Sequence, residues 1–100
     1  MTTLSIDIPQ EKIRKFCREH HIRQLSLFGS VLRNDFSAES DVDMLVEFVP
    51  GHTPGLAFFS LQRDLSELIG RQVDLNTANE LDPSFRRIVL DEAQVVYGPQ

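Results

Sequence analysis

The clearest pattern of apolar and polar positions lies in residues 42–49, where the two kinds alternate. Successive residues of a strand point to opposite faces of a sheet, so this alternation predicts a strand with one buried face. The residues on that buried face are Val42, Met44, Val46 and Phe48. This segment is expected to be the strongest strand of the chain and to contribute one face to the core.

Three segments have the apolar spacing of amphipathic helices: 10–20, 56–69 and one near the C-terminus. Gly70 is placed to end the second helix, and Asp82 is placed to cap the third, with Pro83 at its first position. The inward-facing residues are predicted to be Ile13, Phe16 and Cys17 in the first helix, Leu61, Leu65, Leu68 and Ile69 in the second, and Phe85, Ile88 and Val89 in the third.

Three shorter segments complete the predicted elements as strands: 24–28, 72–76 and 94–97, the last of them at a sheet edge. A break after the first of these leads into a short helix at 30–33, and 34–40 is a polar loop. The order is helix, strand, short helix, strand, helix, strand, helix, strand. This order predicts an α+β fold, with a small mixed β-sheet flanked by helices.

Composition and charge narrow the class of protein. A chain of 100 residues with 41% hydrophobic residues is expected to fold as a single domain, residues 1–100. The net charge of −5 argues against direct binding to nucleic acid, which needs a basic face. No apolar run is long enough to cross a membrane, and no signal peptide is recognisable. With Cys17 as the single cysteine, no internal disulfide is possible, so a cytoplasmic location is expected.

The candidate chemistry begins with three carboxylates. Asp41 and Asp43 are two residues apart at the start of the strongest strand, so they share the face opposite the core. Asp74, between Val73 and Leu75, points the same way if the two strands pair. Carboxylates this close repel one another unless a cation lies between them, and Mg²⁺ prefers oxygen ligands. Three of them can hold two metal ions about 3.5–4 Å apart, although isolated acids at strand starts are often only solvated.

Gly29 and Ser30 form the second half of the candidate site. Glycine lets the backbone approach a phosphate closely, and the start of the following short helix offers N–H groups to an anion. Ser30 could cap that helix, contact a phosphate, or do both. Arg33 is within reach of a phosphate or is a plain surface residue. Glu47 lies on the same acidic face four residues beyond Asp43, as a bystander or as a group that supports the metal ligands.

The spacing of these residues resembles a known signature. Gly29-Ser30, ten intervening residues and then Asp41-Val42-Asp43 are similar to the motif of the DNA polymerase β-like nucleotidyltransferase superfamily. The wider segments 27–33 and 40–48 look like its minimal branch, the MNT-domain proteins, which are usually antitoxins paired with HEPN-domain toxins. The resemblance covers nearly the whole chain, including Asp74. It implies the polymerase β-like nucleotidyltransferase fold.

The resemblance also implies roles. Asp41 and Asp43 would bind two Mg²⁺ ions, and Asp74 would bind the catalytic ion and help to activate the acceptor hydroxyl. Gly29 and Ser30 would hold the β and γ phosphates of ATP. Similar proteins transfer AMP from ATP to a tyrosine hydroxyl of a HEPN ribonuclease toxin and so neutralise it. A hetero-oligomer with such a toxin is the expected partner assembly.

Two alternatives stay open. The chain could neutralise a toxin by contact alone, or it could be a nucleotidyltransferase for small molecules, although such relatives normally carry a second domain for the acceptor. A short chain must find its acceptor on a partner's surface. An exposed docking patch is therefore expected near the carboxylates, contributed by the Pro50–Gly55 loop and by Phe58.

Overall fold

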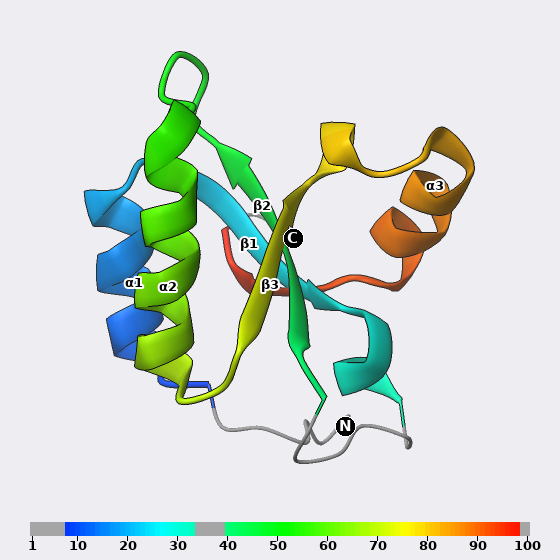
Figure 1. Cartoon of the computed structure of the whole chain (residues 1–100), viewed down its shortest axis with the longest axis horizontal. Helices are drawn as coiled ribbons and strands as arrows, with labels where there is room; N and C mark the ends of the chain where they lie inside the picture. The colour runs from blue at the N-terminus through cyan, green and yellow to red at the C-terminus, as the bar shows by residue number, and fades with distance from the viewer. Residues whose placement is uncertain (1–7, 34–39, 99–100) are drawn as a thin grey trace.

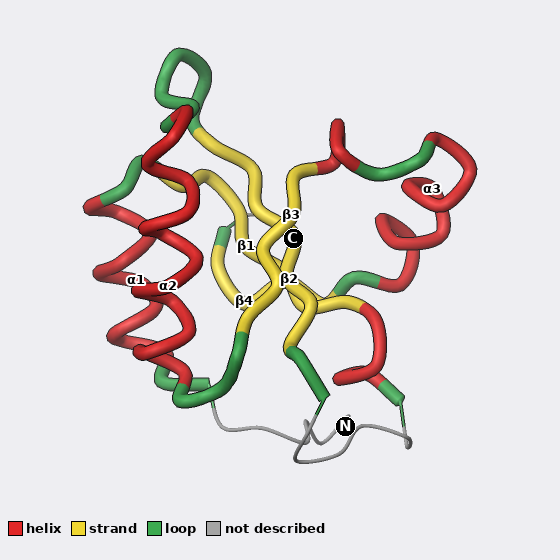
Figure 2. Tube along the Cα trace, viewed as in Figure 1, coloured by secondary structure: helices red, strands yellow, loops and turns green. Residues whose placement is uncertain are grey.

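The computed structural model describes residues 8–33 and 40–98, and its strands form one mixed sheet (Figure 1). The sheet has the order β3-β2-β1-β4. β1 is antiparallel to both of its neighbours, whereas β2 and β3 are parallel. The strands are β1 (Ile22–Phe28), β2 (Val42–Phe48), β3 (Val73–Thr77) and β4 (Gln94–Tyr97). The predicted mixed sheet is confirmed, with β4 at its edge beside β1 (Figure 2).

The predicted helices are present: α1 (Gln10–Glu19), α2 (Phe58–Ile69) and α3 (Pro83–Glu92). Gly70 ends α2 in the left-handed conformation, with φ 79°. The Asp82 carboxylate accepts a hydrogen bond of 3.0 Å from the Ser84 N–H and so caps α3 as predicted. None of the helices in these two described ranges is both long and apolar enough to cross a bilayer. Most of the predicted loop at 34–40 lies outside the described residues.

One face of the sheet carries the main core, under α1 and α2 (Figure 1). The alternating residues of β2 and the stripes of the two helices meet there, as the sequence predicted. The fully buried side chains include Ile13, Cys17, Leu25, Leu27, Val42, Met44, Leu65 and Val73. Burial raises the pKa of the Cys17 thiol to about 12, which fits a core residue rather than a reactive one.

The opposite face is only partly covered, by α3. Phe28 and Leu45 of the sheet pack there against Val89 of the helix. The prediction that Phe85 and Ile88 face inward is wrong, because their exposed fractions are 48% and 52%. α3 lies to the side of the sheet, away from α1 and α2 (Figure 1). Phe28, Ser26 and Leu45 of this second face are buried, whereas Asp43 is only partly buried and Glu47 and Asp74 are exposed.

Candidate active site

The register of the sheet sets Asp43 in the middle of a row of three residues. Phe28 of β1 is paired with Asp43 of β2, and Asp43 is paired with Asp74 of β3. Directly paired residues share a face, so both carboxylates lie on the open side of the sheet. Asp41 precedes β2 and falls on the same side by alternation. The structure thus gathers the three predicted carboxylates at one end of the two parallel strands.

Asp43 is in an unfavourable place for a negative charge. Partial burial raises the pKa of its carboxyl group above the usual range, and the nearby charges of Asp74 and Asp41 raise that pKa further. Arg33 acts in the opposite direction and lowers it. Asp41 and Asp74 themselves are exposed. A cation at this point would relieve the repulsion, so the electrostatics of the three carboxylates favour metal binding.

The three carboxylates do not, however, converge on one point. Within the described residues, no group of three acidic, histidine or cysteine side chains could hold a metal ion. The side chains as they stand therefore do not confirm that all three reach one shared cation, and the assignment of Asp41, Asp43 and Asp74 as metal ligands stays a prediction. Mg²⁺ commonly takes one or two carboxylates and completes its coordination with substrate phosphates. Asp41 and Asp43 fit that smaller donor set.

Gly29 packs directly against the carboxylate of Asp43. Its backbone has φ 77°, and a Cβ atom at this position would collide with Oδ2 of Asp43. The glycine is required both by its left-handed conformation and by this close approach. It also begins the short 3₁₀ turn Gly29–Leu32. The backbone of this turn therefore lies directly beside the central carboxylate.

Ser30 does not cap that turn. The residue before the first helical position is Phe28, and no side chain provides a cap. The capping alternative for Ser30 is wrong because the turn begins one residue earlier than predicted. Ser30 is half-buried at the second position of the turn. Its role as a phosphate contact stays a prediction.

Arg33 lies beside the carboxylates and contacts the end of α3. Its Nη2 atom is 3.7 Å from Oε2 of Glu92, and both side chains are about half exposed. The positive charge of Arg33 lowers the pKa of Asp43, against the burial and the neighbouring acids that raise it. A hollow of about 290 Å³ is lined by Leu32, Arg33 and Glu92. Sequence reasoning missed Glu92. This residue lies 49 positions after Asp43 in the chain, and no local sequence pattern indicates that the two are near each other in the fold.

The expected docking patch is in the wrong place. The Pro50–Gly55 loop follows the end of β2, whereas the aspartates precede or begin that strand, so the two lie at opposite ends (Figure 1). Phe58 is partly buried against the core, with its ring 6.4 Å from that of Phe48. The exposed apolar residues here are instead Phe59, at 70%, and Leu56, at 87%. This patch is remote from the carboxylates.

The paired carboxylates and the glycine turn lie together at one end of the sheet, as the resemblance to nucleotidyltransferases predicted, and sequence comparison shows the family. Residues 11–100 match the profile of the family described as "Polymerase beta, Nucleotidyltransferase". A candidate protein adenylyltransferase of Methanocaldococcus jannaschii, MJ0435, is 34% identical over 90 residues, covering 90% of this chain and 96% of that protein. The chain therefore belongs to the polymerase β nucleotidyltransferase family and is an enzyme of that class.

Solved structures share the fold. A structure described as that of a candidate minimal nucleotidyltransferase is 36% identical, has a TM-score of 0.70, and matches over 84% of this chain and 85% of its own. A second match comes from a complex of a tri-AMPylated HEPN toxin of Shewanella oneidensis with an MNT antitoxin. It has 22% identity and a TM-score of 0.65, over 91% of this chain and 71% of that chain, and concerns the fold alone. The resemblance and fold class predicted from the sequence are confirmed.

Proposed function

We propose that this protein transfers AMP from ATP to a tyrosine hydroxyl of a HEPN-type ribonuclease toxin, and that it acts as the antitoxin of that pair. The observation that carries the proposal is the packing of Gly29 against Asp43, with Asp74 paired on the other side of the same strand. The likeness to proteins named as adenylyltransferases supports AMP transfer to a protein. The shared fold with an MNT antitoxin in complex with an AMPylated toxin points the same way.

In the proposed reaction, each residue of the site has a separate role. The acceptor oxygen forms a bond to the α-phosphorus of ATP, the bond from that phosphorus to the bridging oxygen breaks, and pyrophosphate leaves. In this proposal Asp74, the exposed carboxylate paired with Asp43, accepts the proton of the hydroxyl. The Gly29 turn and Arg33 bind the phosphates of ATP, through backbone N–H groups and a guanidinium.

A divalent cation would be held by Asp41 and Asp43. When bound, Mg²⁺ neutralises charge on the phosphates during the transfer. The burial and crowding of Asp43 support such a site, because an ionised carboxylate is costly there without a counter-charge. A second Mg²⁺ ion, a cytoplasmic location, a single domain spanning residues 1–100 and a hetero-oligomer with the toxin are further parts of the proposal.

The test mixes the purified protein with a purified HEPN partner, Mg²⁺ and ATP labelled at the α-phosphate. Label should appear on the partner with the parent protein, and Asp43→Asn should lower its rate of appearance by roughly a hundredfold or more. Asp64→Asn is the matched control, because Asp64 is an exposed acid on α2, outside the carboxylate row. It should label at the parent rate.

Two results would contradict the proposal. Equal labelling by Asp43→Asn and Asp64→Asn would mean that the row is not the active site. Full neutralisation of the toxin by Asp43→Asn, without label, would show that contact alone silences the partner. Intact mass of the partner provides an independent readout, since each transfer adds one AMP unit.

A further inference from the structure

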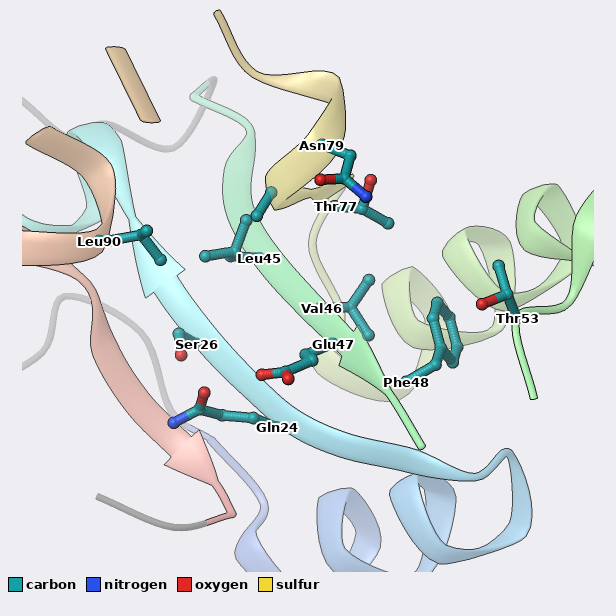
Figure 3. A pocket seen from close by; sticks show the side chains of 11 residues that line it. Gln24, Ser26, Leu45, Val46, Glu47, Phe48, Thr53, Thr77, Asn79 and Leu90 are labelled. Atoms are coloured by element: carbon teal, nitrogen blue, oxygen red, sulfur yellow. The ribbon is translucent and has the colours of Figure 1, made fainter. Parts of the chain in front are cut away.

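A groove at the far end of β2 is lined in part by the sheet face that carries Asp43 and in part by Val46, Phe48 and Thr53 (Figure 3). Leu45 is paired with Ser26, and Glu47 with Gln24, so these residues form two further rows on the same face as the Phe28–Asp43 row. Each step of two strand residues advances by about 7 Å. The groove therefore begins one row beyond Asp43 and reaches Glu47 about 13 Å away.

The groove has defined walls and a volume of about 360 Å³. Leu90 of α3 points towards Leu45 and makes one apolar side (Figure 3). Thr77, the last residue of β3, and Asn79 line the other side, where β2 continues beyond the end of β3 and is paired only with β1. A volume of this size falls within the range, from about 300 Å³, of pockets that bind small ligands or side chains. Its apolar part lies nearer to the carboxylates and its acidic part farther away.

The negative charge of Glu47 in the groove favours a basic side chain over a nucleotide as the bound group. Glu47 contacts Arg23 at 3.4 Å, with both side chains more than half exposed. Such a surface ion pair contributes little, so an incoming cation can replace Arg23. A carboxylate here would repel the phosphates of a nucleotide, whereas it would attract a lysine or arginine side chain. The net charge of −5 adds to that attraction.

We propose that this groove holds the acceptor segment, an extended basic peptide of the partner protein, and that Glu47 selects a basic side chain next to the acceptor tyrosine. The tyrosine ring lies between Leu45 and Leu90, and its side chain is long enough to bring the hydroxyl to the Asp43–Asp74 row. The basic neighbour lies on the Glu47 row. This assignment rests on the proposed function and adds the class of peptide that the site accepts.

The experiment uses two short synthetic peptides that contain one tyrosine, flanked either by lysines or by glutamates. Binding is followed by NMR shifts of the groove amides, with Mg²⁺ and a non-hydrolysable ATP analogue present. Transfer is followed with labelled ATP. The parent protein should favour the lysine peptide in both measurements, and Glu47→Lys should reverse the preference, with a change on the order of tenfold or more in the ratio.

The matched control is Glu19→Gln, compared with Glu47→Gln. Glu19 is also an exposed acid with a basic partner, Lys15 at 3.9 Å, but it lies on α1 across the sheet. Glu47→Gln should raise the KM for the lysine peptide and leave the KM for ATP unchanged, and Glu19→Gln should change neither. A raised KM for ATP in Glu47→Gln would overturn the assignment, because the groove would then hold the nucleoside.

Binding and transfer separate the two hypotheses. If the lysine peptide binds in the groove in a Glu47-dependent manner but receives no label, the groove assignment stands and the proposed reaction fails. If label is transferred with the same peptide preference in Glu47→Lys as in the parent protein, the reaction stands and the groove assignment fails. Absence of shifts at the groove amides with either peptide would also overturn it.

Discussion

The two faces of the sheet differ in what their residues do. The face under α1 and α2 is closed and apolar, and nearly every residue that points into it is buried. The face beside α3 combines a small apolar cluster with a crowded carboxylate row, a glycine turn and an open groove. One side stabilises the fold, while the other carries electrostatic and conformational costs, which fits the proposed active site.

The largest effect expected from this contrast concerns two leucines. Leu65→Ala on the closed face should lower the free energy of unfolding by about 2–5 kcal/mol, because it leaves a cavity in a fully buried position. Leu90→Ala on the groove side should change it by no more than about 0.5 kcal/mol, since Leu90 is 53% exposed. Urea unfolding followed by circular dichroism measures both. Equal losses would show that the second face is packed as tightly as the first.

A smaller effect is expected at the glycine turn. Gly29→Ala and Gly51→Ala place alanine at similar positive φ values, 77° and 86°, at a cost of roughly 1–2 kcal/mol each. Only Gly29→Ala adds a collision, with the Asp43 carboxylate, while nothing lies within 4 Å of the Cβ position at Gly51. Gly29→Ala should therefore be the less stable variant. It should also lose ATP binding, measured by calorimetry.

A double variant sharpens this comparison. Removing the Asp43 carboxylate in Gly29→Ala/Asp43→Ala should restore stability to about that of Gly51→Ala, because only the cost of the left-handed backbone then remains. If the double variant is as unstable as Gly29→Ala, the collision with Asp43 is not the cause of the loss.

The smallest effect concerns the charge of Asp43. Its pKa in the folded protein is raised, so the folded state keeps this proton to a higher pH than the unfolded chain does. Stability contributed by this group therefore falls as pH rises from the unfolded value through the folded one, and stays lower above it. Asp43→Asn removes that loss and should stabilise the metal-free protein at pH 7 by on the order of 0.5 kcal/mol. Thermal unfolding of Asp43→Asn and of the parent protein between pH 4 and 8 should show the higher stability of the variant only at the upper end of this range. A variant that is less stable than the parent protein at pH 7 would contradict this prediction.

The closed face could be predicted from the sequence because its pattern is local. The alternation in β2 shows which face of the strand is buried, and the apolar stripe of α2 shows which side of the helix is buried. These two apolar surfaces pack against each other in the core. The same reasoning failed for Phe85 and Ile88 of α3. Helical spacing shows which residues share a side, but not whether another element covers that side.

The site could be predicted in part for the same reason. Strand parity placed Asp41, Asp43 and Asp74 on one face. The contact of Gly29 with Asp43 depends on the register that pairs Phe28 with Asp43, which no local pattern contains. The prediction of the docking patch was wrong because the alternation along a strand shows which face a residue lies on, but not which end of the strand it is near. Val49 is six positions after Asp43, which corresponds to about 20 Å along a strand.

The parallel pairing of β2 with β3 has a consequence for the order in which the enzyme is assembled. Asp43 and Gly29 meet through antiparallel neighbours, whereas Asp74 reaches the row only after the chain has passed through α2 and crossed over to the far side of β2. Crossover pairings of this kind form slowly, because chain entropy is lost before the contact is gained. A chain that stops before residue 73 contains the glycine turn and two aspartates but lacks the third. Under the proposed function, which needs Asp74, activity therefore requires that the crossover is complete.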